Sequence, residues 1–169
     1  ETETYGITSF VYRQRRPFHP GRLQDLLTRG IPGVLRSKGF FWLSTRMDWV
    51  GDLAIVGGST EIRPAGHWWA SRRRVRRGLG AAFTAGDLGT PPPGADELPE
   101  PQQRRALEKI WHPRYGDRRQ ELVMIGVDLP ERAIRAELDR CLLREEEFAA
   151  GPEDWGRHPD PFPRWSRTH

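Results

Sequence analysis

The chain has 169 residues and a formal net charge of +4, with 36% hydrophobic and 30% charged residues. This length suits one globular domain with a buried core. No apolar run approaches the roughly 20 residues that cross a bilayer, and no signal-peptide pattern is present, which argues against a membrane or exported protein. The single cysteine, Cys141, excludes an internal disulfide. It also fits a reducing compartment, so we expect a cytoplasmic protein.

Charge is divided unevenly along the chain. Residues 1–80 carry 14 Lys/Arg against 6 Asp/Glu, a net of +8, and residues 81–169 carry 13 against 17, a net of −4. The basic first half could attract an anionic partner, such as nucleic acid or an acidic protein surface. A surface rich in arginine for solubility is the alternative.

Two elements are expected before residue 33. Residues 5–13, YGITSFVYR, alternate as a strand does, with Phe10 and Tyr12 on one face. A helix then begins at Pro20, where the missing N–H of proline costs nothing, and it ends at Gly30. The buried stripe of this helix consists of Leu23, Leu26 and Leu27.

Residues 34–60 are predicted to form a long β-hairpin with a polar turn around residues 47–52. Because strand side chains alternate, the first arm has two different faces. One face suits packing under helices and holds Leu35, Ser37, Gly39, Phe41 and Leu43. The other is cationic and aromatic and holds Arg36, Lys38, Phe40 and Trp42.

The cationic and aromatic face of the hairpin is a candidate partner-binding surface. Aromatic rings beside cations are also what a single-strand nucleic-acid binder places on a sheet. Aromatic residues half-buried under a helix would give the same sequence pattern.

The segment after the hairpin has three parts that differ in composition. A short extended piece, residues 61–70, ends in GHWWA, and residues 78–103 are dominated by Gly, Ala, Pro and acids. That second stretch cannot bury enough apolar surface to offset its ordering entropy, so we predict a mobile loop. Between them lies a basic run that is a candidate polyanion-binding set, although most such runs are solvated surface: Arg72, Arg73, Arg74, Arg76 and Arg77.

Order returns in the second half of the chain. We predict a short helix over residues 104–111, an interior strand over 119–127 and a short helix over 145–150. A longer helix opens near Pro130, and residues 156–169 form an irregular tail whose aromatic residues pack back onto the body. The apolar face of the longer helix holds Ile134, Leu138, Cys141 and Leu142.

This order of elements predicts an α+β fold. Antiparallel hairpins make a mostly antiparallel sheet of four to five strands, with two main helices packed on one face. The arrangement resembles a split β-α-β unit with a long mobile insertion.

No catalytic residue and no metal ligand are expected. A nucleotide-binding loop needs glycines followed by Lys and Ser/Thr, and the two lysines, Lys38 and Lys109, lie outside such a context. The five histidines are scattered without ligand spacing, and there is no CxxC pair. Cys141 falls on an apolar helix face, where a thiol is usually an inert part of the core.

Several segments, in the same order along the chain, resemble the C-terminal domain of the CobW family of P-loop GTPase metallochaperones. They are YGITSFVYRQRRPFHPGRL, PGVLRSKGFFWLSTR, GGST, GHWWA, GDRRQELVMIGVDL, LDRCLLREEEFAAGPEDW and DPFPRW. The resemblance implies an accessory role beside a GTPase domain, in a family that uses GTP, Mg²⁺ and Zn²⁺. The P-loop and the cysteine-rich metal motif of that GTPase domain are not in this sequence, so neither activity is assigned to any residue here.

We therefore predict that residues 1–169 form a non-catalytic accessory domain of a CobW-like, zinc-linked GTPase, with no cofactor of its own. Its expected partners are the GTPase domain of the same polypeptide or a homologue, and a client metalloprotein, with no membrane involved. The alternative is an RNA- or DNA-binding module that uses the basic N-terminal half. Salt-dependent retention of an oligonucleotide would distinguish the two.

Overall fold

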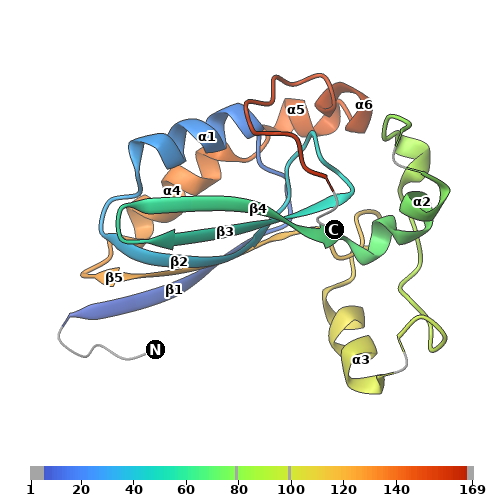
Figure 1. The fold of residues 1–169 in the computed structure, drawn as a ribbon, viewed down its shortest axis with the longest axis horizontal. Coiled ribbons are helices and arrows are strands. Elements are labelled where there is room, and N and C mark those ends of the chain that lie inside the picture. Colours follow the sequence, from blue (N-terminus) through green and yellow to red (C-terminus); the bar gives the residue numbers. More distant parts are fainter. Residues whose placement is uncertain (1–5, 79, 99, 167–169) are drawn as a thin grey trace.

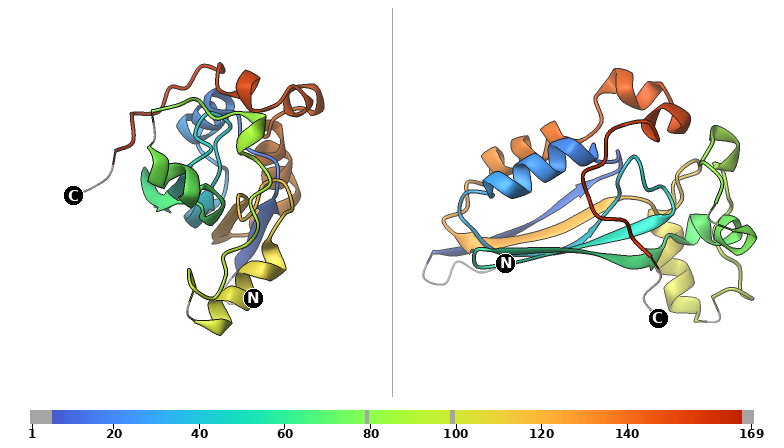
Figure 2. Two further views of the ribbon diagram at one scale, coloured as in Figure 1. Left: turned by 90° about the vertical axis from the view of Figure 1, so that its right-hand side faces the viewer. Right: turned by 45° about the horizontal axis from the view of Figure 1, so that its top comes forward.

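The computed structural model describes residues 6–166 apart from residues 79 and 99. Its centre is a five-stranded sheet in the order β1-β5-β2-β3-β4, and each neighbouring pair of strands is antiparallel. Two helices, α1 (Pro20–Arg29) and α4 (Glu131–Cys141), lie side by side on one face of this sheet (Figures 1 and 2). The strands are β1 (Ile7–Gln14), β2 (Val34–Phe41), β3 (Trp49–Val56), β4 (Ser59–His67) and β5 (Gln120–Val127).

The predicted α+β class and the split β-α-β arrangement are confirmed. β1 and β2 both run antiparallel to β5, so they are parallel to each other with β5 inserted between them. α1 connects β1 to β2 over one face of the sheet, which is the split form of a β-α-β unit.

The main core lies between the sheet and these two helices. α1 contributes Leu23 and Leu26, and α4 contributes Ile134 and Leu138, each at most 2% exposed. Burying each such side chain stabilises the fold by about 1.5–3 kcal/mol. The helices pack on alternate residues of the strands, namely Phe10, Tyr12, Phe41, Leu53, Ile55, Leu122 and Met124.

Glycine is required at one point of this core. Gly51 of β3 pairs with Phe41 of β2, and the Phe41 ring lies against the Gly51 backbone. A Cβ added at Gly51 would come within 2.6 Å of that ring, far closer than carbon atoms pack. The small residue lets the aromatic ring lie flat on the sheet under the helices.

A second cluster lies at the end of the sheet where β2 leaves it. Trp42 is fully buried there, and its backbone N–H donates a hydrogen bond to Gln120 Oε1 at 2.7 Å. The amide nitrogen of Gln120 donates in turn to the carbonyls of Trp42 and Arg16, so this buried side chain is satisfied. The other members of the cluster are Met47, Trp68, Tyr115, Leu143 and Trp155.

Residues 68–119 form an arm beside this end of the sheet. It contains two 3₁₀ turns, η1 (Trp69–Ser71) and η2 (Ala85–Asp87), and two helices, α2 (Arg72–Arg77) and α3 (Pro101–Ile110). The chain ends in α5 (Glu145–Ala149), α6 (Pro152–Trp155) and the tail, which curves back over the sheet (Figure 1). As predicted, Phe162 of the tail is buried in the main core and Trp165 packs against it.

Two arginines, one buried and one half-buried, join the arm to the rest of the domain. Arg118, 1% exposed, donates to the carbonyl of Met47 at 2.8 Å, to the carbonyl of Tyr115 and to Ser71 Oγ at 2.6 Å. Arg15 of the segment after β1 donates to three further carbonyls of the arm. Burial lowers the pKa of Arg118 to about 10, so the side chain remains a cation at neutral pH and its donors stay available.

Several predicted boundaries differ from the structure. The turn placed around residues 47–52 is wrong, because β3 begins at Trp49 and the connection is residues 42–48. The extended piece predicted over residues 61–70 is extended only to His67, the end of the nine-residue strand β4, and the 3₁₀ turn η1 begins at Trp69. The basic run is the helix α2, and α3 begins at Pro101, inside the predicted loop. The misplaced turn has a physical cause: the connection is largely buried and includes Trp42, Leu43 and Met47, so polarity did not mark where the strand ends.

The segment 78–103 keeps several contacts with the body. Leu98 is buried, and the Phe83 ring lies between the guanidinium groups of Arg74 and Arg118, about 5 Å from each. Its mobility stays a prediction. No helix in the described part of the chain is long and apolar enough to cross a membrane.

Candidate functional site

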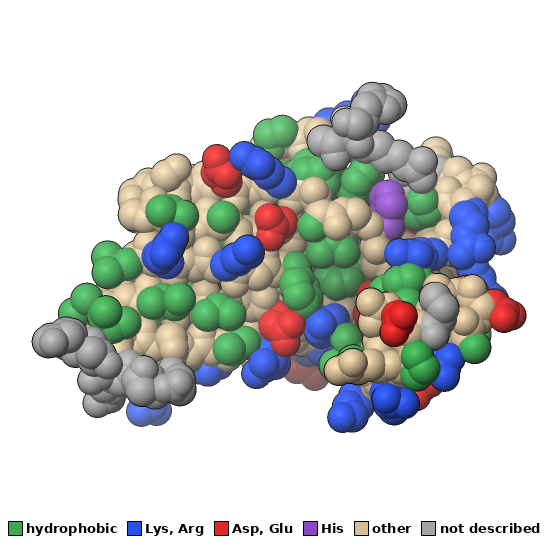
Figure 3. All heavy atoms as spheres, turned by 60° about the horizontal axis from the view of Figure 1, so that its bottom comes forward, with side chains coloured by type: hydrophobic (Ala, Val, Ile, Leu, Met, Phe, Trp, Pro, Cys, Tyr) green, Lys and Arg blue, Asp and Glu red, His purple; other side chains and the backbone are tan. Residues whose placement is uncertain are grey.

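The described residues leave the face of the sheet opposite α1 and α4 uncovered over much of its length, and Figure 3 looks onto this face. Side chains of neighbouring strands form rows across this open face, because antiparallel partners point to the same side. From β1 to β4, one row is Ser9, Ile125, Arg36, Val56 and Ser59. The next row is Val11, Val123, Lys38, Ala54 and Glu61. The third is Arg13, Glu121, Phe40, Asp52 and Arg63.

Large aliphatic side chains are exposed at the end of the open face farthest from the arm. Ile7 and Val127 are cross-strand partners and are 45% and 46% exposed. Leu35 is 51% and Val56 56% exposed, and both lie where β2 meets the β3–β4 turn. Figure 3 shows hydrophobic side chains spread over this part of the sheet. Exposed apolar side chains grouped in this way are typical of an interaction surface.

Two of the predicted partner-binding residues, Arg36 and Lys38, lie in the middle of the open face. Both side chains are exposed. Within the described part of the chain neither forms an ion pair, whereas Arg13 and Arg63 in the third row pair with glutamates. Basic side chains stand among the hydrophobic ones in Figure 3. The open face therefore combines exposed aliphatic side chains with two unpaired cations.

The other two predicted residues are not free surface. Trp42 is 0% exposed, so its placement on the cationic face is wrong. β2 ends at Phe41 and the chain turns into the body, which ends the alternation one residue early, and Trp42 Nε1 donates to Met47 Sδ at 3.1 Å. Phe40 is on the open face but half-buried, with the Arg119 guanidinium 4.7 Å from its ring centre.

Leu35 also differs from its predicted place in the helix-covered core. The pairing of β2 with β5 shifts between Val34 and Arg36, which marks a β-bulge at Leu35. One extra residue in the strand puts Val34 and Ser37 toward the helices and leaves Leu35 and Arg36 on the open side. Sequence alternation gives no sign of a bulge, so the exposed Leu35 was missed.

The predicted polyanion-binding arginines lie on α2, and most of them are engaged. Arg74 Nε lies 3.0 Å from Asp48 Oδ2 in a pair that is largely buried. The Arg72 guanidinium lies 3.2 Å from the centre of the Trp69 ring, and a weaker ion pair at 3.7 Å holds Arg73. The two remaining arginines of the run are exposed and form no ion pair within the residues described. Two free cations make a small surface for a polyanion.

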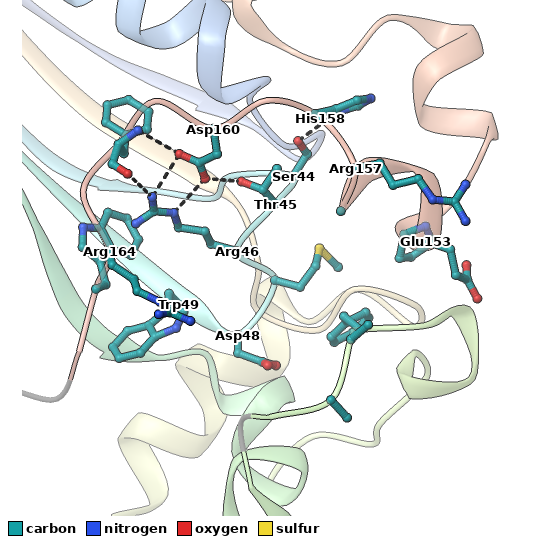
Figure 4. Close-up of a pocket in the computed structure, with 18 of the residues that line it drawn as sticks. Ser44, Thr45, Arg46, Asp48, Trp49, Glu153, Arg157, His158, Asp160 and Arg164 are labelled. Atoms are coloured by element: carbon teal, nitrogen blue, oxygen red, sulfur yellow. Dashed lines mark hydrogen bonds and ion pairs between the residues drawn. The ribbon is translucent and has the colours of Figure 1, made fainter.

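A cleft of about 800 Å³ lies between the β2–β3 connection, the arm and the tail (Figure 4). Asp160 of the tail accepts from Thr45 Oγ1 at 2.5 Å and from Arg46 Nε at 2.8 Å. Burial alone would raise the pKa of Asp160, but the hydrogen bonds from Arg46 and Thr45 outweigh it and lower that pKa. The Arg46–Asp160 pair holds the tail in place. Arg74 pairs with Asp48 Oδ2 at the cleft, while Asp48 Oδ1 is buried without a hydrogen-bond partner among the described residues.

No group of three or more His, Cys, Asp or Glu side chains that could hold a metal ion exists among the described residues. The rings of His19 and His158 are in tilted contact with centres 4.9 Å apart, and His19 caps α1 by accepting the N–H of Arg22. Burial raises the pKa of Cys141 to about 11, so its thiol stays protonated and is a poor nucleophile.

The sequence matches the family "Cobalamin synthesis protein cobW C-terminal domain" over residues 7–142. The chain is a member of this family. It is 33% identical over 166 residues to "Zinc-regulated GTPase metalloprotein activator 1" of Dictyostelium discoideum, covering 96% of this chain and 30% of that protein. It is 28% identical over 154 residues to a zinc chaperone of Mycobacterium tuberculosis, covering 91% and 34%.

The chain spans about a third of the length of the curated relatives it matches. Among solved structures, the zinc-bound YjiA GTPase of E. coli aligns with a TM-score of 0.46 at 16% identity, covering 82% of this chain and 30% of that one. At these values the structural likeness carries no conclusion about this chain.

Proposed function

We propose that this domain is a non-catalytic accessory domain of a zinc-linked GTPase, and that its open sheet face binds the GTPase domain of the same polypeptide or of a homologue. Membership of the CobW C-terminal family supports the first part. The printed names of the two relatives, a zinc-regulated GTPase metalloprotein activator and a zinc chaperone, support the connection to zinc and to a GTPase. A client metalloprotein is the second partner that those names suggest.

The observation that carries the proposal is the composition of β5. Its residues are apolar on both faces, with Leu122 and Met124 toward the helices and Val123, Ile125 and Val127 toward the open side. Strands with such continuous apolar runs are usually covered on both faces. Here one face is covered by α1 and α4, so a partner protein is the expected cover of the other.

Binding can be tested with the part of the Dictyostelium relative that lies outside the 166 matched residues. Calorimetric titration with this domain should show saturable binding. Val56→Asp, which places a charge among the exposed aliphatic side chains, should weaken the binding at least tenfold. Ala133→Asp, an exposed alanine on α4 at the covered side, is the matched control and should leave the affinity unchanged.

Two results would contradict this proposal. Failure of the wild-type domain to bind would remove the accessory role, and equal effects of the two aspartate variants would move the contact away from the open face. The non-catalytic part has its own measurement: titration of the domain with GTP and Mg²⁺ should give no saturable heat.

A further inference from the structure

We propose, resting on the proposed function, that the segment covering the open face is an amphipathic helix that carries two carboxylates one turn apart, which pair with Arg36 and Lys38. The proposed function names the partner as a GTPase domain. This inference states which kind of surface on that partner contacts the open face. It follows from three features of the face: the position of the two cations, their spacing and the side chains around them.

The two cations require carboxylates in whatever covers them. Arg36 lies between Ile125 and Val56 of the neighbouring strands, and Lys38 lies between Val123 and Ala54 in the next row. A cover that buried these aliphatic neighbours would remove water from both cations. A buried charge without a partner is strongly destabilising, whereas a carboxylate with good geometry compensates the loss of water. The two cations therefore exclude an entirely apolar partner surface, which would leave them buried without partners. The aliphatic rows exclude a highly charged surface, which would lose its water without compensation.

The spacing of the cations matches one turn of helix. Residues i and i+2 of a strand point to the same side and lie about 7 Å apart along it. Helix residues i and i+4 have their Cβ atoms about 5–6 Å apart, and both basic side chains are long enough to adjust to that difference. The other face provides an internal example, where Asp139 of helix α4 accepts a hydrogen bond from Tyr12 of β1 at 2.7 Å.

Two other occupants fit the face less well. In a symmetric pair of these domains an axis through the centre of the face would bring Arg36 and Lys38 toward the same residues of the second copy, which repels. Single-stranded nucleic acid would need free aromatic faces for stacking. The aromatic ring of this face, Phe40, already contacts the Arg119 guanidinium and the edge of Trp68. Aliphatic rows with embedded cations suit an acidic amphipathic protein surface.

The first test compares two pairs of neutralising substitutions in the same titration with the remainder of the Dictyostelium relative. Arg36→Gln with Lys38→Gln should lower the affinity at least tenfold and flatten its decrease with salt between about 50 and 500 mM, because ion pairs are screened by salt. Arg105→Gln with Lys109→Gln, an exposed pair on α3, makes the same change in net charge and should change the affinity less than twofold.

The second test locates the carboxylates. A carbodiimide joins an amine to a carboxylate in direct contact, so cross-linking of the complex should attach Lys38 to an Asp or Glu that has a second acidic residue three or four positions away. Lys109 is the control amine and should give no such product.

The outcomes separate this inference from the proposed function. Binding that survives the Arg36/Lys38 double substitution with its salt dependence intact would overturn the inference and leave the proposed function standing. Absence of any binding by the wild-type domain would overturn both. Self-association that Val56→Asp abolishes, or oligonucleotide binding that the double substitution abolishes, would show that a second copy or a nucleic acid covers the face, and either result would overturn the inference.

Discussion

The two faces of the sheet are made by alternate residues of the same strands, but one face is closed and the other is open. In β5, Leu122 and Met124 are 0% exposed under α1 and α4. Val127, on the opposite side of the same strand, is 46% exposed, and its partner Ile7 is 45% exposed. The strand has the same apolar character on both sides. The two sides differ only in whether helices cover them. An apolar strand pattern therefore predicts that both sides of the strand are covered, but it does not identify the segment or protein that covers each side.

The same difference appears in how cations are treated. On the covered side Arg22 of α1 pairs with Glu147 at 2.6 Å, and Arg118 at the end of the sheet has acceptors for its donors. On the open side Arg36 and Lys38 have no ion pair among the described residues. Arg22 and Arg118 thus have partners within the domain, as do Arg13 and Arg63 in the third row of the open face. Among the described residues, Arg36 and Lys38 of the open face have no such ion pair and are available to another molecule.

The largest effect should come from the aromatic residues at the end of β2. Phe41→Ala and Trp42→Ala should each lower the free energy of unfolding by about 3–5 kcal/mol, because both side chains are at most 1% exposed and would leave cavities. Urea denaturation of the two variants measures this directly. Strand alternation placed Trp42 on the cationic and aromatic face, where its truncation would cost less stability than that of Phe41. A loss under about 1 kcal/mol for Trp42→Ala would agree with that placement and contradict the burial seen here.

Next in size is the buried arginine that joins the arm to the sheet. Arg118→Met keeps much of the side-chain volume but removes the guanidinium donors to the carbonyls of Met47 and Tyr115 and to Ser71 Oγ. The two carbonyls keep only one longer hydrogen bond each, at 3.3 Å, from Ser71 Oγ and from the backbone N–H of residue 118. We expect a loss of about 2–4 kcal/mol in urea denaturation, together with faster proteolysis within residues 78–103. Arg114→Met removes the same charge from an exposed side chain and is the control. Equal stability of the two variants would mean that the arm is held by its apolar contacts alone.

Much of this architecture could be predicted from the sequence because its elements follow simple periods. Helix α4 shows its buried face directly in Ile134, Leu138 and Cys141, and β5 shows a dense apolar run. The antiparallel order and the helices on one face follow from these elements. The placement of Arg36 and Lys38 on the side away from the helices also follows from alternation, while their role in binding remains a proposal.

What could not be predicted are departures from the period of two. The bulge at Leu35 turns two successive residues to the open side, and the early end of β2 takes Trp42 into the body. Both depend on contacts with chain far away in sequence: the first on pairing with β5, the second on the buried amide of Gln120. Local propensity carries no information about such partners.

A smaller, pH-dependent effect should come from the ion pair between α1 and α5. Hydrogen bonds from the Arg22 guanidinium lower the pKa of Glu147 to about 2, well below its ordinary value. A carboxylate with a lowered folded-state pKa adds stability above its ordinary pKa, and that stability is lost as pH falls toward 2. Glu147→Gln should therefore cost about 1–2 kcal/mol at pH 7 and little at pH 2.

Urea denaturation at both pH values measures this difference, and Glu145→Gln, at an exposed glutamate of the same helix, is the control. A loss from Glu147→Gln that is the same at both pH values would indicate that packing rather than charge connects α1 to α5.

The smallest effect on stability is expected from Val56→Ser in β3, and its comparison with the neighbouring residue Ile55 is the sharpest test of the two faces. Ile55 faces the helices and is 7% exposed, whereas Val56 faces the open side and is 56% exposed. Ile55→Ser should lower the free energy of unfolding by about 3 kcal/mol or more, and Val56→Ser should change it by under about 0.5 kcal/mol. The two substitutions are one position apart in the strand and make almost the same chemical change. The difference between their free energies of unfolding therefore reports whether the side chain is covered. Comparable losses in the isolated domain would mean that part of this same chain already covers the open face, and the partner surface would then have to lie elsewhere.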